Sequence, residues 1–152
     1  MNSTQPETPP LPRDFGYDQV AENQRESLDY PITPAVYQGF LDTFHDHSPI
    51  HVDESHARAR GFPGRVMHGS ILNGFISHFV GMWFPGRPGL LLSVDLRFAN
   101  PSYLGDVIRL ESVVRQKLDA HRVILLDVTL TNLTRTQLAA RGRIQVMIKD
   151  NV

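Results

Sequence analysis

The chain has 152 residues, of which 41% are hydrophobic and 20% charged, and its formal net charge is −1 at pH 7. This composition indicates one globular domain, and the near-neutral charge gives no basic surface for nucleic acid or an anionic membrane. The sequence has no cysteine, which excludes thiol nucleophiles, disulfides and thiolate metal sites. It has neither a secretory signal nor a run of about 18 apolar residues, so we expect a cytoplasmic protein without a membrane span.

The N-terminal part of the chain predicts an arm, a strand and a helix. Residues 1–14 carry four prolines among polar residues, which predicts a mobile arm. A strand is expected over about residues 24–32. Thr33 and Pro34 form the pattern of an N-cap followed by proline at the first helical position, so we expect a helix to about Thr43.

A longer helix is expected in the middle of the chain, after a short one from about Asp53 to Arg60. The pattern for the longer helix runs from His68 to about Trp83. Its apolar residues recur at helical spacing and form one stripe. They are Ile71, Leu72, Phe75, Ile76, Phe79 and Val80.

The period of the apolar residues changes to two after the prolines and glycines of residues 85–89. Alternation over about residues 90–98, 108–114, 124–130 and 140–148 predicts four strands joined by short connections, which favours an antiparallel sheet. Such a sheet needs a cover for its apolar face, and the central helix is the long candidate. We therefore expect a single α+β domain over residues 15–152.

Two short motifs of the sequence contain candidate catalytic residues. Asp46 and His51 stand five residues apart on a segment that Pro49 is expected to break, and His68-Gly69 stands at the head of the expected central helix. An acid, a base and an oriented backbone N–H are the parts needed to move a proton beside a carbonyl and to hold an oxyanion. Together they favour an enzyme, although an isolated Asp-x4-His pair is more often part of a surface loop.

Neighbouring residues allow other interpretations. His45, His47, His51 and His56, with Asp46 and Asp53, offer metal-ligand chemistry, but their spacing matches no metal motif and no metal is expected. Asp53 is expected to cap the short helix that follows it. Arginines at 58, 60, 65 and 87 could meet the phosphates of a nucleotide-containing ligand.

Linked motifs in this order resemble the MaoC-like dehydratases, also called (R)-specific enoyl-CoA hydratases, which have the hot-dog fold. The first is His45-Asp46-His47-Ser48-Pro49-Ile50-His51-Val52-Asp53, where Ser48 replaces the asparagine of the family phrase. The others are His68-Gly69, a serine eight residues later at Ser77, and Phe98-Ala99-Asn100-Pro101-Ser102-Tyr103-Leu104-Gly105-Asp106. The resemblance implies a long central helix wrapped by a curved antiparallel sheet of about five strands.

The resemblance also implies roles for particular residues. Asp46 and His51 would hold a water and share the acid and base roles, and the Gly69 N–H would face the thioester carbonyl oxygen. His68, Ser48 and Ser77 would line or fix the substrate site, with Ser48 making fewer hydrogen bonds than asparagine. The residues Tyr103, Gly105 and Asp106 are expected to shape the turn between two strands.

By this resemblance, the substrate is an acyl-CoA thioester, or one carried by acyl carrier protein, and no metal or redox cofactor is needed. Hydration of a trans-2-enoyl thioester to the (R)-3-hydroxyacyl form is the expected reaction. A hot-dog thioesterase and a non-catalytic acyl-thioester binding subunit are the alternatives. Open sheet edges and the resemblance predict a homodimer or a dimer of dimers.

Overall fold

Five antiparallel strands form one sheet in the computed structural model, which describes residues 10–149. The strand order is β1-β3-β4-β5-β2, so β1 and β2 are the two edges. The strands are β1 (Arg25–Pro31), β2 (Gly89–Phe98), β3 (Val107–Leu118), β4 (Val123–Asn132) and β5 (Gln137–Ile148). The predicted α+β class and the predicted antiparallel sheet of about five strands are confirmed.

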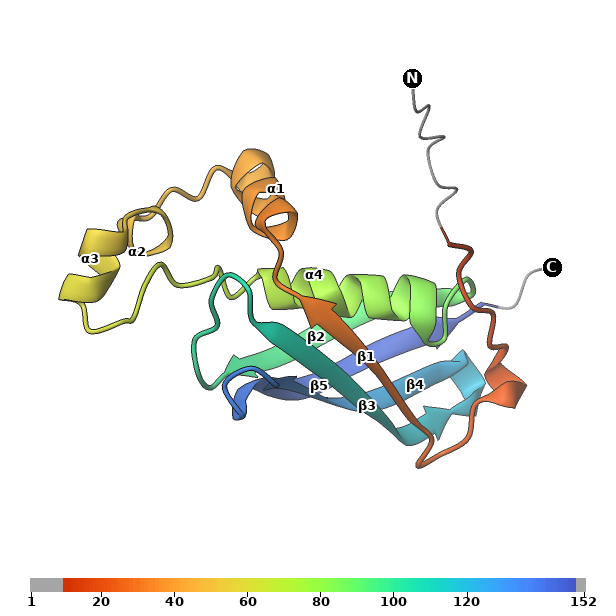
Figure 1. The fold of residues 1–152 in the computed structure, drawn as a ribbon. Coiled ribbons are helices and arrows are strands. Elements are labelled where there is room, and N and C mark those ends of the chain that lie inside the picture. The colour runs from red at the N-terminus through yellow and green to blue at the C-terminus, as the bar shows by residue number, and fades with distance from the viewer. Residues whose placement is uncertain (1–9, 150–152) are drawn as a thin grey trace, which may run out of the picture.

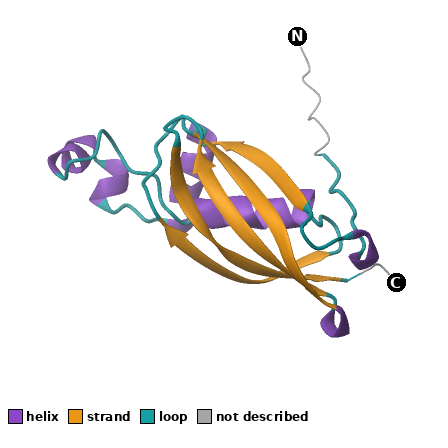
Figure 2. Cartoon of the chain, turned by 90° about the horizontal axis from the view of Figure 1, so that it is seen from below, coloured by secondary structure: helices purple, strands orange, loops and turns teal. Residues whose placement is uncertain are grey.

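One face of the sheet forms the core. Buried residues alternate with exposed ones along β3, β4 and β5, because successive side chains of a strand point to opposite faces. Register shifts at Leu91/Ser93, Val114/Gln116 and Leu130/Thr131 bend the strands, so that the sheet curves around the helix on its inner face (Figure 2). Its largest fully buried side chains are Ile108, Leu110, Ile124, Leu126, Leu130, Ile144 and Ile148.

The helix on that face is α4 (Ile71–His78), which continues as the π-helical turn η2 (Phe79–Trp83) (Figure 1). Ile76 and Phe79 have no exposed surface, as the predicted apolar stripe requires. The predicted start at His68 is wrong by three residues. His68, Gly69 and Ser70 form a tight turn in which each carbonyl accepts a hydrogen bond from the N–H three residues later. Regular α-helix begins only at Ile71.

Three further helices lie near the N-terminal end of α4. They are α1 (Pro34–Phe44), α2 (Pro49–Val52) and α3 (Glu54–Ala59), and the last two project beyond the end of the sheet (Figure 1). Thr33 caps α1 as predicted, by accepting a hydrogen bond from the Val36 N–H, and Asp53 caps α3 in the same way. Pro49 was expected to break helical structure, but it occupies the first position of α2, where its missing N–H costs nothing.

The predicted N-terminal arm falls partly outside the described residues. Where the structure describes it, Arg13 is bound to the domain: its N–H donates to the Met82 carbonyl at 2.9 Å and its carbonyl accepts from Arg87 at 2.8 Å. Asp14 forms a β-bridge with Gly86. The end of the predicted arm is thus attached to the turn that follows η2.

No helix within residues 10–149 is long and apolar enough to cross a membrane. The expected cytoplasmic location stays a prediction.

Candidate active site

His51 is held in one tautomer by the backbone opposite it. It lies in α2, and its Nδ1 is 2.7 Å from the carbonyl oxygen of Val66. A carbonyl can only accept, so Nδ1 carries the proton and donates it. The Nε2 atom is left as an unprotonated acceptor in the neutral ring, which is the state that a general base requires.

The backbone of His51 is fixed as well. The buried hydroxyl of Tyr37, on α1, donates to the His51 carbonyl, and the Val66 carbonyl lies 3.3 Å from the same hydroxyl. Burial raises the pKa of Tyr37, so the hydroxyl keeps its proton for this contact. Sequence analysis did not identify Tyr37, since a tyrosine on the apolar face of a helix carries no sign of the partner that its hydroxyl reaches.

His68 lies directly beneath His51. The two rings are stacked with centroids 3.9 Å apart, and His68 is only 2% exposed. Its Nε2 donates to the backbone carbonyl of Asp46 at 2.8 Å, and its buried Nδ1 has no partner among the described residues. Burial lowers the pKa of His68, so this ring is neutral near neutral pH and places no positive charge beside His51.

Asp46 completes the cluster from the segment between α1 and α2. One carboxylate oxygen accepts from the Ser48 N–H at 3.2 Å, and the other lies 3.9 Å from the Nε2 of His68. One carboxylate oxygen of Asp46 and one nitrogen each of His51 and His68 lie within 4.8 Å of one another. The structure therefore brings the predicted acid and the predicted base together, with half of the Asp46 side chain open to solvent.

The same three residues have the donor types of a metal site, but their arrangement fits one poorly. Each imidazole donates one N–H to a backbone carbonyl, which leaves one nitrogen on each ring for a ligand. The rings are stacked at an interplanar angle of 29°, and a metal must lie in the plane of each imidazole that binds it. Stacked rings do not direct their remaining lone pairs toward one point, so the geometry supports acid–base chemistry better than coordination.

Gly69 leaves its backbone N–H free at the entrance to α4. No group within residues 10–149 accepts a hydrogen bond from that N–H, whereas the Gly69 carbonyl accepts from Leu72 at 3.0 Å. A Cβ at this position would lie 3.2 Å from the ring of Phe98. Glycine thus keeps open the space between the turn and the end of β2.

Two grooves reach the cluster, and we name them by their walls. The helix groove, about 730 Å³, runs between α1 and α4 and has Asp46 in its lining. The loop groove, about 410 Å³, is lined by His51 and Gly69. Other residues of the helix groove are Val36, Phe40, Phe44, Ile71 and Phe75, and those of the loop groove include Phe62, Met67, Leu72, Phe98 and Pro101.

Two of the predicted site residues lie elsewhere or act through the backbone. Ser77 is exposed on α4 and lines neither groove, so within this chain it lies apart from Asp46 and His51. Ser48 is the N-cap residue of α2, yet its side chain forms no capping bond. It acts through its backbone, where its N–H binds Asp46 and its carbonyl accepts from the His51 N–H at 2.8 Å.

A central helix wrapped by a curved antiparallel sheet defines the hot-dog fold, and in this chain an Asp–His pair lies near the N-terminal end of that helix. The R-hydratase PhaJ1 of Pseudomonas aeruginosa has the same fold, with a TM-score of 0.84 over 92% of this chain and 89% of that chain, at 24% identity. Residues 17–136 match the MaoC like domain family. The chain belongs to this family of MaoC-like dehydratases.

Relatives with a described activity are hydratases and dehydratases. An (R)-specific enoyl-CoA hydratase of Rhodospirillum rubrum is 30% identical over 92 residues, which is 60% of this chain and 64% of that protein. A 3-hydroxybutyryl-CoA dehydratase of Methylorubrum extorquens is 30% identical over 97 residues, 64% of this chain and 62% of that protein. The aligned part thus spans a little under two thirds of these relatives.

The lowered pKa of His68 predicts a loss of stability in acid. The unfolded chain titrates this group near its ordinary pKa of about 6.5, whereas the folded protein resists protonation, so acid favours unfolding. The contribution is complete above that pH and is lost as the pH falls below it. Urea unfolding at pH 7.5 and pH 5 should show a smaller loss for His68→Gln than for the unchanged protein. Equal losses would contradict the assignment.

Proposed function

We propose that this protein is a hydro-lyase that reversibly hydrates trans-2-enoyl-CoA thioesters to (R)-3-hydroxyacyl-CoA. The observation that carries the proposal is the tautomer of His51. The bond from Nδ1 to the Val66 carbonyl leaves Nε2 as a free acceptor in a groove that also holds the free N–H of Gly69, with the Asp46 carboxylate adjacent. Membership of the MaoC-like family supports the same class of reaction.

The reaction adds the oxygen of water to C3 and a proton to C2. Asp46 and His51 would hold the water between them, remove one of its protons as the C3–O bond forms, and return a proton to C2. Negative charge then develops on the thioester carbonyl oxygen, as in an enolate. The Gly69 N–H is the donor for that oxygen, and a fixed backbone donor needs no reorganisation as the charge appears.

In the proposed binding mode the substrate extends through both grooves. The thioester carbonyl would lie beside Gly69 in the loop groove, C3 beside Asp46 and His51, and the acyl chain beyond Asp46 in the helix groove. The helix groove suits a hydrocarbon chain because its walls are mostly aliphatic and aromatic side chains. Coenzyme A is the proposed carrier, with acyl carrier protein as the other possibility.

A test with crotonyl-CoA separates this function from its alternatives. Hydration removes the absorbance of the enoyl thioester without releasing a thiol, whereas a thioesterase releases free coenzyme A. A binding subunit changes neither signal. Thiol release without hydration would overturn the proposed reaction.

Substitution of the acid–base pair should remove most of the activity. Asp46→Asn and His51→Ala are each expected to lower the turnover of crotonyl-CoA by about two orders of magnitude, because each removes a group that transfers a proton. His47→Ala is the matched control, since His47 is an exposed histidine beside Asp46. Circular dichroism would establish that the variants fold. Near-normal turnover in either variant would show that the pair does not do the chemistry.

A side chain at Gly69 should block the site. Gly69→Val is expected to abolish turnover, because even a Cβ would lie 3.2 Å from the Phe98 ring in the groove that the thioester enters. Gly81→Val is the control, since an added Cβ there meets nothing within 4 Å. An active Gly69→Val enzyme with unchanged kcat would remove the backbone-donor role from this position.

We also propose that the working unit is a homodimer joined along β2, alone or within a dimer of dimers. This strand is a sheet edge, and Leu90, Leu92 and Val94 on it are 50%, 45% and 37% exposed. An apolar edge strand with free backbone groups pairs readily with another strand. Phe98 at the end of β2 lines the loop groove, so a second copy on this edge would lie close to the substrate.

Light scattering should give twice the 17.2 kDa mass of the chain, or a multiple of that dimer. Leu92→Asp is expected to shift the protein toward monomer, because it places a charge on the proposed interface. Leu104→Asp is the control at a comparably exposed leucine away from β2. A stable, active protein of single-chain mass would contradict the dimer.

A further inference from the structure

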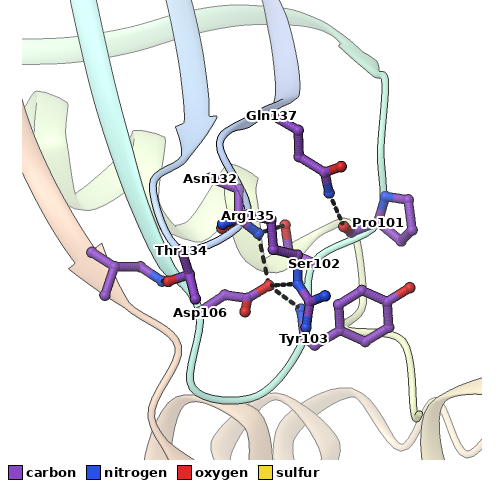
Figure 3. A network of polar contacts seen from close by, with 9 residues as sticks. Pro101, Ser102, Tyr103, Asp106, Asn132, Thr134, Arg135 and Gln137 are labelled. Carbon is purple, nitrogen blue, oxygen red and sulfur yellow. Dashed lines mark hydrogen bonds and ion pairs between the residues drawn. The ribbon is translucent and has the colours of Figure 1, made fainter. Parts of the chain in front are cut away.

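A second polar cluster lies between the β2–β3 loop and the β4–β5 turn (Figure 3). It adjoins the loop groove, because Ser102 belongs to both. We call it the Asp106 network, and it consists of Ser102, Tyr103, Asp106, Asn132 and Arg135. Asp106 and Asn132 are 2% and 0% exposed. Burial of a carboxylate costs free energy, and the shape of one turn does not explain why Asp106 is buried.

One oxygen of Asp106 accepts three hydrogen bonds from different parts of the chain. The Tyr103 N–H donates at 3.0 Å, the Asn132 side-chain amide at 2.7 Å, and the Nε of Arg135 at 2.7 Å. The sequence predicted that Asp106 shapes the turn after Tyr103, and the first of these bonds does that. The other two are not needed for a turn, and they anchor the β2–β3 loop to the β4–β5 connection.

Further bonds fix the part of this loop that faces the candidate active site. The Asn132 amide also reaches the Ser102 hydroxyl at 3.3 Å, and Gln137 donates to the Pro101 carbonyl at 3.3 Å (Figure 3). The Ser102 carbonyl is thereby held in place, and it accepts the Met67 N–H at 2.8 Å. The β2–β3 loop is therefore bonded to the segment that leads into α4.

Met67 connects the network to the proposed base. The preceding residue, Val66, supplies the carbonyl that accepts the Nδ1–H of His51, and the following residue is His68, whose ring stacks on His51. A movement of the Ser102 carbonyl would shift Met67 and with it the acceptor for His51. The path from Asp106 to this acceptor has two hydrogen bonds, Tyr103 N–H to Asp106 and Met67 N–H to Ser102. They are joined by the peptide links between Ser102 and Tyr103 and between Val66 and Met67.

We propose that Asp106, held by Asn132 and Arg135, is a positioning residue that keeps the Val66 carbonyl where it selects the Nδ1–H tautomer of His51. The proposal rests on the function proposed above, in which the free Nε2 of His51 does the chemistry. Asp106 itself would touch no substrate. Its effect would reach the reaction through the backbone of residues 66–69.

The test replaces Asp106 by asparagine in the full-length protein, which removes the charge and leaves a neutral amide oxygen to accept the three hydrogen bonds, so that each is weakened. Three measurements follow: ¹⁵N NMR of the His51 ring, hydrogen exchange of the Met67 amide, and kcat and KM for crotonyl-CoA. Asp106→Asn should add the Nε2–H tautomer to the spectrum and speed exchange at Met67. We expect kcat to fall on the order of tenfold, with a smaller change in KM.

Asp127→Asn is the matched control. Asp127 on β4 also binds two arginines, Arg115 at 2.5 Å and Arg143 at 3.1 Å, but on the outer face of the sheet, away from the β2–β3 loop. It should leave all three measurements unchanged. If Asp106→Asn does not fold, Arg135→Gln decides the matter by the same measurements, since Arg135 reaches the same carboxylate from a partly exposed position.

An unchanged His51 tautomer with unchanged Met67 exchange in a folded variant would overturn the proposal, whatever happens to kcat. A fall in activity alone would then reflect a general structural effect. If the unchanged protein does not hydrate crotonyl-CoA, the proposed function fails, but the NMR and exchange measurements still decide whether Asp106 controls the His51 ring.

Discussion

Burial of α4 against the concave face of the sheet is the constraint on which the rest of the molecule depends. Ile76 and Phe79 lose all their exposed surface there, and each such side chain contributes about 1.5–3 kcal/mol by leaving water. The apolar stripe fixes the rotation of the helix, so the position of its N-terminal end is fixed as well. Gly69 and His68 occupy that end, and the candidate active site is therefore placed by the core.

The candidate active site is ordered mainly by contacts with the rest of the domain. His51 lies on α2, a helix of four residues that cannot be stable alone, and its ring is held by a carbonyl and by a second imidazole. The stacked partner, His68, is buried and neutral, so it supports the ring without competing for a proton. This arrangement fixes one tautomer of His51 and leaves its other nitrogen available for the proposed role of general base.

Family membership and the arrangement of the site support the proposed activity in different ways. The chain's described relatives are hydratases and dehydratases, so family membership supports the proposed class of reaction. The arrangement of the site supports a proposal about the substrate, because the side chains that line the two grooves beside Asp46 and His51 set what could fit there. If the proposed function holds, the helix groove would limit the acyl length, and the proposed dimer would add a wall near Phe98.

The sequence by itself determined the elements and the class of protein. Apolar alternation predicted β2 to β5, helical spacing predicted α4, and the Thr33-Pro34 pattern predicted the start of α1, because each of these depends on neighbours in the chain. The linked motifs predicted the MaoC-like family and selected Asp46 and His51. These inferences needed no knowledge of which distant residues meet.

Only the tertiary structure decided how the selected residues are used. The acceptor for His51 lies 15 residues away at Val66, and the carbonyl bound by His68 lies 22 residues away at Asp46. No local pattern encodes a contact to a backbone carbonyl, since every residue has one. For the same reason the sequence could not show that Ser77 is exposed outside both grooves, or that Asp106 is bonded through Met67 to the segment beside His51.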